Sequence, residues 1–356
     1  MTKILFTPGP VMMFPETIRA AAIQVPYART KAFSEIVLRA EAALLRLVSA
    51  PPGSRALFLT GSGTAAMEAA VVNFTDANAS AAVVNGGAFG QRFSDICARH
   101  GVRVQQAMVD RDPLTDGKAL GQLRAPVGTL FINAHETSVG HVYDLQATAR
   151  FCLERDCLHV VDGIGLFITD RLDMTDSNID VLILSSNKGL ALAPGLSMLV
   201  LSPKALTRIV GEPRSYYLDL RAMVSDGGRG QTPFTPAIGV ILQLEERLSS
   251  LLRSGLSRSI EHARQLAAHF RRGISDLPLR PYSRHMPNAM TALEVVDPGL
   301  SARSIVDRLD AEHGLVVAPN GGKLETRMFR VAHMGNLTTG DVDLLLKALK
   351  HILQHR

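Results

Sequence analysis

Short apolar, β-branched runs alternate with longer amphipathic stretches over about the first 250 positions of the 356-residue chain. This pattern is typical of parallel strands joined by helical crossovers, since such strands are buried on both faces while each helix buries one stripe. Strands are predicted at 56–60, 81–85, 103–108, 129–133, 159–162, 181–185 and 196–201. Helices are predicted at 64–74, 91–100, 145–154, 237–252 and 256–273, among others. The pattern therefore predicts an α/β fold built on one wide, mostly parallel seven-stranded sheet.

The pattern changes after Pro278. Three more strands are predicted at 291–296, 315–318 and 328–332, with helices at about 302–313 and 339–353. These elements indicate a smaller α+β unit. We expect an N-terminal segment of residues 1–15, a large α/β domain of residues 16–253 and a small C-terminal α+β domain of residues 254–356.

The bulk composition narrows the class of protein. Hydrophobic residues make up 46% of the chain, and the net charge of +5 is spread without a basic run, which favours an anionic small molecule over a nucleic acid as partner. Cys97, Cys152 and Cys157 lack metal-ligand spacing, and the last two fall in a helical pattern, so we expect no disulfide framework and a reducing cytoplasm. No signal peptide and no apolar run of membrane-spanning length is evident, so a secreted or membrane-spanning protein is not expected.

A glycine-rich turn, Gly61-Ser62-Gly63-Thr64, follows the first predicted strand and opens a helix. Backbone N–H groups at a helix start favour an anion such as phosphate. The turn also fits the Gly-x-Gly-x-x-Ala fingerprint, so a nicotinamide enzyme is an alternative, as is a tight turn without ligand. The next strand ends in Asn85-Gly86-Gly87, where a dinucleotide site would have a ribose-binding carboxylate, and this counts against the nicotinamide reading.

Asp162 closes one apolar strand, and Lys188 follows the next one after Ser185, Ser186 and Asn187. Pyridoxal 5'-phosphate needs both residue types, because a lysine amine binds its aldehyde and a carboxylate keeps its pyridine nitrogen protonated. Taken singly, Asp162 also fits a loop-capping carboxylate and Lys188 a surface lysine. Together with the glycine-rich turn they predict a pyridoxal-phosphate site.

A further polar cluster, from His135 to Gly140, follows the predicted strand at 129–133. Open α/β sheets bind ligands at the carboxyl ends of their strands, which is where this cluster lies. Thr137 is placed to donate to the phenolic oxygen of a pyridoxal ring, and His135 to lie near the face of the ring. A hydrogen-bonded turn with a structural histidine is the alternative interpretation.

The motifs, taken in chain order, resemble those of the class V aminotransferases of pyridoxal-phosphate fold type I. The likeness spans nearly the whole chain and is greatest to the 2-aminoethylphosphonate:pyruvate and the alanine or serine:glyoxylate transaminases. The motifs are Thr7-Pro8-Gly9-Pro10, Gly61-Ser62-Gly63-Thr64, Asn85-Gly86 with Phe89-Gly90-Gln91-Arg92, His135-Glu136-Thr137-Ser138-Val139-Gly140, Val161-Asp162, Ser186-Asn187-Lys188 and Phe329-Arg330-Val331.

The resemblance implies a role for each matched position. Lys188 would form the Schiff base and Asp162 would bind the pyridinium nitrogen. The cofactor phosphate would be held by Ser62, Gly63 and Thr64, the ring hydroxyl by Thr137, and a further phosphate or ring contact would come from Ser185 or Asn187. Phe89 would stack on the ring, and Arg330 would clamp the substrate carboxylate. Thr235, with Thr232 as second choice, would reach the phosphate across the interface of a homodimer.

Two stretches depart from the family pattern, and both bear on the substrate. In the family, a glycine commonly comes soon after the arginine that corresponds to Arg330, and this chain lacks it there. After Asp162, the chain has Gly163-Ile164-Gly165 where serine or alanine is more usual. Arg29 is a candidate second anion clamp at the mouth of the site, for a phosphonate or a distal carboxylate, or else an ordinary surface arginine.

The expected function is therefore a pyridoxal-phosphate-dependent transaminase that moves an amino group from 2-aminoethylphosphonate to an α-keto acid such as pyruvate. An alanine or serine:glyoxylate (or pyruvate) aminotransferase is the alternative, and a pyridoxal-phosphate lyase of the same fold is the second. A sulfur-transfer enzyme would need a reactive cysteine on a mobile loop, whereas all three cysteines fall in helical patterns. A nicotinamide oxidoreductase or a non-catalytic nucleotide-binding module would leave Lys188 and Asp162 without a role.

Overall fold

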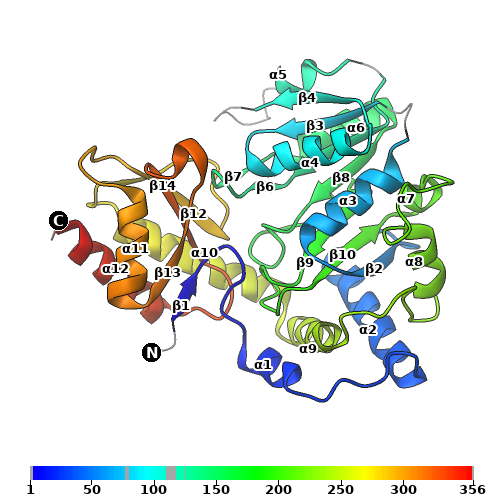
Figure 1. Ribbon diagram of the computed structural model, residues 1–356, viewed down its shortest axis with the longest axis horizontal. Coiled ribbons are helices and arrows are strands. Elements are labelled where there is room, and N and C mark those ends of the chain that lie inside the picture. Colours follow the sequence, from blue (N-terminus) through cyan, green and yellow to red (C-terminus); the bar gives the residue numbers. More distant parts are fainter. Residues whose placement is uncertain (1–2, 77–79, 110–117, 125, 355–356) are drawn as a thin grey trace.

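Two sheets organise the chain into two lobes that lie side by side (Figure 1). The computed structural model describes residues 3–76, 80–109, 118–124 and 126–354. The larger sheet has seven strands and the smaller has five, and a two-stranded hairpin forms a third, separate sheet.

The large sheet confirms the predicted α/β fold class. Its strand order is β2-β10-β9-β8-β5-β3-β4. The strands are β2 (Arg55–Thr60), β3 (Ala81–Asn85), β4 (Val104–Met108), β5 (Thr129–Asn133), β8 (Leu158–Asp162), β9 (Val181–Ser185) and β10 (Leu196–Leu201). Only β10 runs against its neighbours β2 and β9, so the sheet is mostly parallel.

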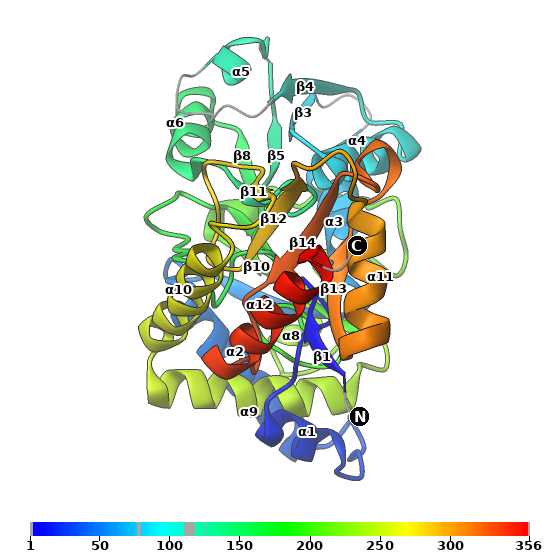
Figure 2. The same cartoon turned by 90° about the vertical axis from the view of Figure 1, so that its left-hand side faces the viewer.

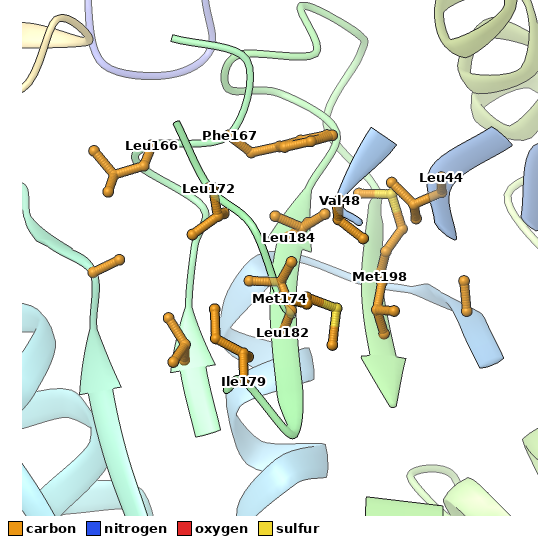
Figure 3. Close-up of a cluster of buried hydrophobic side chains, with 14 of the residues drawn as sticks. Leu44, Val48, Leu166, Phe167, Leu172, Met174, Ile179, Leu182, Leu184 and Met198 are labelled. Atoms are coloured by element: carbon orange, nitrogen blue, oxygen red, sulfur yellow. The ribbon is translucent and has the colours of Figure 1, made fainter. Parts of the chain in front are cut away.

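Alternate residues of each strand pack against helices on opposite faces of this sheet. On one face lie α2 (Lys31–Leu47), α6 (Leu145–Arg155) and α9 (Ile238–Ser254), and on the other lie α3 (Gly63–Phe74), α4 (Ala88–Arg99), α7 (Pro203–Thr207) and α8 (Leu220–Gly227). In β9, Leu182 and Leu184 belong to the first core and Ile183 to the second. Figure 3 shows Leu182 and Leu184 gathered with Leu44 of α2. Two apolar cores therefore hold the sheet rigid on both sides.

The small sheet has the order β1-β13-β14-β12-β11. Its strands are β1 (Ile4–Phe6), β11 (Leu279–Pro281), β12 (Met290–Val295), β13 (Leu315–Pro319) and β14 (Met328–Ala332). The helices α10 (Leu256–Gly273), α11 (Ala302–His313) and α12 (Thr339–Gln354) share an apolar core with it (Figure 2). β1 pairs in parallel with β13, so three residues of the predicted separate N-terminal segment form an edge of the small sheet. A three-residue strand is too short to show a hydrophobic period.

The remaining elements are short. They are α1 (Pro15–Ala21), α5 (Lys118–Gly121), the 3-10 helix Gly322–Leu324 and the hairpin of β6 (His135–Glu136) and β7 (His141–Val142). Within the described ranges, the structure has no helix that is long and apolar enough to cross a membrane.

The position predicted for Cys157 is wrong. Helix α6 ends at Arg155, and Asp156 takes a left-handed conformation (φ 47°) that stops the helix. Cys157 therefore lies between α6 and β8. All three cysteines are free and buried, so none lies on an exposed loop.

Candidate active site

One cavity of about 190 Å³ lies where parallel strands of the large sheet end. The carboxyl ends of such strands share one edge of the sheet, so residues far apart in sequence meet there. The cavity brings together most of the predicted site residues: Ser62, Gly63, Thr64, Phe89, Thr137, Asp162, Ser185, Asn187 and Lys188. Pro8, Arg92, His135, Ile164, Gly165 and Met334 also line it.

Lys188 projects into this cavity from the turn after β9. Its Nζ donates a hydrogen bond of 2.7 Å to the carbonyl of Pro8. Burial lowers the pKa of Lys188 to about 8, the Asp162 carboxylate acts in the opposite direction, and the positive charges of Arg330 and Arg92 lower it further. About a tenth of the amine is thus unprotonated at pH 7, far more than for an ordinary lysine, and this favours its use as a nucleophile.

The N-terminal motif forms a wall of the cavity. A Cβ at Gly9 would come within 2.4 Å of Cδ and 2.6 Å of Nζ of Lys188. Gly9 also has a φ of 134°, a conformation that side chains rarely adopt. The glycine of the Thr7-Pro8-Gly9-Pro10 motif is therefore needed to make room for the lysine.

Asp162 lies at the end of β8 and is buried. Its Oδ2 accepts a hydrogen bond of 2.6 Å from Asn133 Nδ2, and its Oδ1 accepts one of 2.9 Å from the backbone N–H of Ile164. Burial raises the pKa of Asp162 to about 6, and these two hydrogen bonds limit the rise. Asn133 was not predicted as a site residue. Its position as the last residue of the neighbouring strand was the sequence feature that could have indicated it.

The glycine-rich turn presents a helix start to the cavity. Ser62 is the N-cap of α3, and its side chain makes no capping hydrogen bond. A Cβ at Gly63 would come within 2.4 Å of Ile164 Cδ1, so the close approach of these two segments depends on glycine. Free N–H groups at the start of a helix suit a phosphate.

Arg92 is a cavity residue that the sequence analysis did not single out. Its Nη1 donates to Thr64 Oγ1 at 3.0 Å, and its guanidinium lies 4.7 Å from the centre of the Phe89 ring. It thereby links the glycine-rich turn to the predicted stacking residue. The sequence could have indicated this role, because Arg92 lies one helical turn after Phe89 and therefore on the same face of the helix.

The hairpin after β5 fixes the start of α4. The buried Glu136 carboxylate accepts hydrogen bonds of 3.1 Å from the backbone N–H groups of Phe89 and Gly90. Ser138 Oγ accepts another from Ala88 N at 3.1 Å. A carboxylate at a helix N-terminus is favourable, so Glu136 anchors the helix that carries Phe89 and Arg92. The sequence analysis gave Glu136 no role, since its partners lie some 46 positions away.

His135 is buried and lines the cavity with one ring nitrogen unpartnered. Its Nδ1 donates to the carbonyl of Gly165 at 3.1 Å, which leaves Nε2 as an acceptor, and Nε2 is buried without a hydrogen-bond partner. Burial lowers the pKa of His135 to about 4, so the ring is neutral at pH 7. A Cβ at Gly165 would come within 2.6 Å of Nδ1. The departure from the family pattern at Gly165 thus has a physical reason: the glycine makes room for His135.

Arg330 lies beside the cavity and does not line it. Its Nη2 donates to the carbonyl of Pro319 at 2.7 Å, and its Nε is buried without a partner. Its charge nevertheless lowers the pKa of both Lys188 and His135, which places the guanidinium within electrostatic range of the site.

Arg29 and Thr235 lie outside the lining of the cavity in their own chain, and both are exposed. Arg29 Nη1 donates to Gln231 Oε1 at 2.9 Å and to the carbonyl of Thr232 at 2.7 Å. The two candidates are therefore tied to one surface loop, and the roles suggested for them remain predictions.

The donor set fits pyridoxal phosphate. The cavity has a desolvated amine, a buried carboxylate, a helix start with an arginine for a phosphate, and an aromatic ring. The unpartnered Nε2 of His135 offers a polar contact to a group bound in the cavity, and Gly9 lets Lys188 reach into it.

Comparisons with known proteins agree with this geometry. The family model described as aminotransferase class-V matches residues 12–332. The chain is 29% identical over 374 residues to the alanine–glyoxylate aminotransferase of Callithrix jacchus, covering 99% of this chain and 88% of that protein. It is 27% identical over 359 residues to the soluble hydrogenase small subunit of Synechococcus sp., covering 98% and 92%. A crystal structure of a subgroup IV aspartate aminotransferase from Thermus thermophilus superposes with a TM-score of 0.90 at 28% identity, covering 98% of this chain and 100% of that one.

Proposed function

Because the chain belongs to the class V aminotransferases, which depend on pyridoxal phosphate, we propose that it moves the amino group of a small amino acid, alanine or serine, to glyoxylate or pyruvate. The observation that carries this proposal is the placement of Lys188 and Asp162 on one cavity with a phosphate-binding helix start. The similarity to an alanine–glyoxylate aminotransferase supports the choice of donor and acceptor.

The residues that would hold the cofactor follow from the donor set. Its phosphate would bind at Ser62, Gly63 and Thr64, with the positive charge of Arg92 behind them. Asn187, whose side chain accepts a hydrogen bond of 2.8 Å from Ser185, would add a further polar contact. On the ring, Phe89 would supply the stacking face and Thr137 a donor to the hydroxyl.

When bound, the cofactor supplies an electron sink for the charge that develops on the substrate carbon. Asp162 would hold a negative charge against the ring nitrogen, and the cation there would lower the raised pKa of its carboxyl group again. The Nζ of Lys188 would hold the cofactor through its aldehyde and, when free, would carry a proton from the substrate carbon to the cofactor carbon. Pro8 orients this amine through its carbonyl.

Arg330 would bind the substrate carboxylate. Its buried Nε has no partner, and burial of an arginine without an anion is unfavourable, so a carboxylate placed there gains a charge-assisted hydrogen bond. The Pro319 carbonyl fixes the guanidinium from the other side.

2-Aminoethylphosphonate is the second candidate donor. A phosphonate would need a cation besides Arg330, and Arg92 is already committed to Thr64 and the phosphate region. The remaining candidate, Arg29, lies outside the cavity of its own chain. Arg29 could bind a substrate only in the cavity of a neighbouring subunit. We therefore propose alanine or serine as the donor in preference to 2-aminoethylphosphonate.

A homodimer would bring Arg29 and Thr235 to the partner's cavity together, because Arg29 is bonded to the loop that carries Thr235. The segment before Arg29 exposes several large apolar side chains to solvent. Those of Ile18, Ile23, Val25 and Tyr27 are 46–74% exposed. Exposed apolar surface of this kind suits a contact with a second copy. We propose a cytoplasmic homodimer, to be checked by the mass of the holoenzyme in solution.

The donor is tested by single half-reactions of the holoenzyme, followed through the visible absorbance of the lysine-bound cofactor. We expect alanine or serine to abolish this absorbance faster than 2-aminoethylphosphonate, and glyoxylate or pyruvate to restore it. A faster reaction with 2-aminoethylphosphonate, slowed selectively by Arg29→Ala, would establish the second candidate instead. Continuous consumption of serine without any keto acid would identify a lyase, which shares the same lysine and aspartate.

A further inference from the structure

A second cavity, of about 260 Å³, adjoins the active site. Met334 lines both cavities, and Gly189, the residue after Lys188, lines the second one. The other walls come from both lobes: Arg247 lies on α9 at one side, and Arg258 and His262 lie on α10 at the other.

Arg247 is 6% exposed and has no carboxylate within 4.0 Å in the part of the chain that the structure describes. Its Nε is buried without a hydrogen-bond partner, and its guanidinium lies 4.0 Å from the centre of the Phe14 ring. Burial lowers the pKa of Arg247 to about 10, and the negative charge of Glu16, which is not within ion-pair distance, acts in the opposite direction, so the group stays charged at neutral pH. A buried charge without a counterion in contact is unfavourable, and an aromatic face offsets only part of that.

His333 adds a second buried polar atom without a partner. Thr291 Oγ1 accepts a hydrogen bond of 3.0 Å from Arg271 Nε and lies 2.9 Å from His333 Nε2. When the Thr291 hydroxyl donates its own proton to Nε2, the ring proton of a neutral His333 lies on Nδ1, which is buried and unpartnered. This side chain is 1% exposed and lines the second cavity, so it offers a donor there.

The start of α10 completes the positive surroundings. This 18-residue helix begins at Leu256, and its N-cap, Gly255, has no side chain to cap the first N–H groups. Arg258, on its first turn, is exposed and makes no ion pair among the described residues. A helix start, two arginines and a histidine donor thus surround one space with no acidic side chain in its lining.

We propose that this second cavity binds a small anion, a phosphate or a carboxylate, between Arg247 of the large lobe and Arg258 and His333 of the small lobe. The anion gives Arg247 a counterion in direct contact and accepts a hydrogen bond from its unpartnered Nε–H. Because its ligands come from α9, α10 and the segment after β14, binding favours one relative placement of the two lobes next to Lys188. The site does not rest on the proposed function.

The experiment is thermal unfolding of the holoenzyme with increasing inorganic phosphate, with potassium chloride at matched ionic strength as reference. In the holoenzyme the cofactor's own phosphate fills the glycine-rich turn, so added phosphate reports another site. We expect a saturable rise of the unfolding midpoint with phosphate and none with chloride. Succinate and acetate, tested in the same way, distinguish a carboxylate from a phosphate as the natural ligand.

Variants locate the anion. Arg258→Gln, an exposed change that should leave folding intact, is expected to weaken the apparent affinity about tenfold, the effect of losing one charged hydrogen bond. Arg247→Met should remove the response. Two controls should keep it: Arg330→Gln, which alters the other candidate anion subsite, and Arg280→Gln, an arginine of the small sheet outside this cavity. The proposal is overturned if no anion gives a saturable rise, or if Arg330→Gln removes the rise while Arg258→Gln does not.

Discussion

Asn133 and Asp162 lie opposite each other at the ends of the parallel strands β5 and β8, and the amide of Asn133 donates to the Asp162 carboxylate at 2.6 Å. The other amide atom, Asn133 Oδ1, is buried and has no partner. This pair holds a negative charge in a buried position, where it can stabilise a protonated pyridine ring. The arrangement favours cofactor binding at the expense of the stability of the cofactor-free protein.

The first prediction concerns that balance. The unfolded carboxyl group has an ordinary pKa of 3.8 and the folded one a pKa of about 6, so the folded apoprotein loses stability as the pH rises through this interval. Asp162→Asn removes the ionisation, and a rotated Asn133 can accept from the new amide. We expect the variant apoprotein to be more stable than the parent by about 1 kcal/mol at pH 8 and not at pH 4, and to be inactive.

Urea unfolding at the two pH values measures the difference directly. Asp156→Asn is a suitable control, because Asp156 is exposed and its pKa is lowered by its hydrogen bond to Arg208, so the same change there should destabilise or be neutral. Destabilisation by Asp162→Asn at pH 8 would show that the carboxylate stabilises the apoprotein.

The second prediction concerns the amine. Lys188→Ala should lower kcat by a factor of about 10³ or more, since both attachment of the cofactor and proton transfer are lost. The phosphate contacts at the glycine-rich turn remain, so pyridoxal phosphate should still bind noncovalently. Borohydride treatment followed by mass measurement should fix the cofactor to the parent protein and leave the variant unlabelled. Covalent labelling of the variant would assign the attachment to another lysine.

The third prediction concerns Arg92, which bridges Thr64 and Phe89. Arg92→Met should weaken cofactor binding about tenfold by removing a charge near the phosphate and the anchor of the Thr64 hydroxyl. Arg99→Met, an exposed arginine in the last turn of the same helix, is the matched control and should have little effect. Titration of the apoprotein with pyridoxal phosphate gives both affinities. Equal affinities for the two variants would leave Arg92 without a role in cofactor binding.

The fourth prediction concerns the contact between Gly165 and His135. Gly165→Ala places a Cβ 2.6 Å from His135 Nδ1 and should destabilise the protein by about 1–3 kcal/mol. His135→Ser removes the obstructing ring, so the double variant should recover much of this loss. A double-mutant cycle in urea measures the coupling. Additive effects of the two changes would mean that the contact does not explain the glycine.

Local sequence patterns are enough to predict the strands of the large sheet and the residues expected to carry the chemistry. Strand β9 is an apolar run, Val181 to Leu184, that ends in Ser185 and is bounded by polar residues. The place of such a strand, and of Lys188 just beyond it, therefore follows from a local pattern. The glycine-rich turn, Asp162 and Lys188 are each local to a strand end, and the topology of parallel strands then brings them to one edge.

The groups that support these residues are found only in the folded chain. Asn133 meets Asp162 through strand register, Glu136 meets the start of α4 across 46 positions, and Gly165 accommodates His135 across 30. Such contacts depend on the packing of separate elements, for which a single sequence has no periodic signal. The same reason hides β1, which is too short to show a period and takes its place from pairing with β13. The roles of Arg29 and Thr235 do not follow from the fold of a single chain, because they depend on how two folded chains associate.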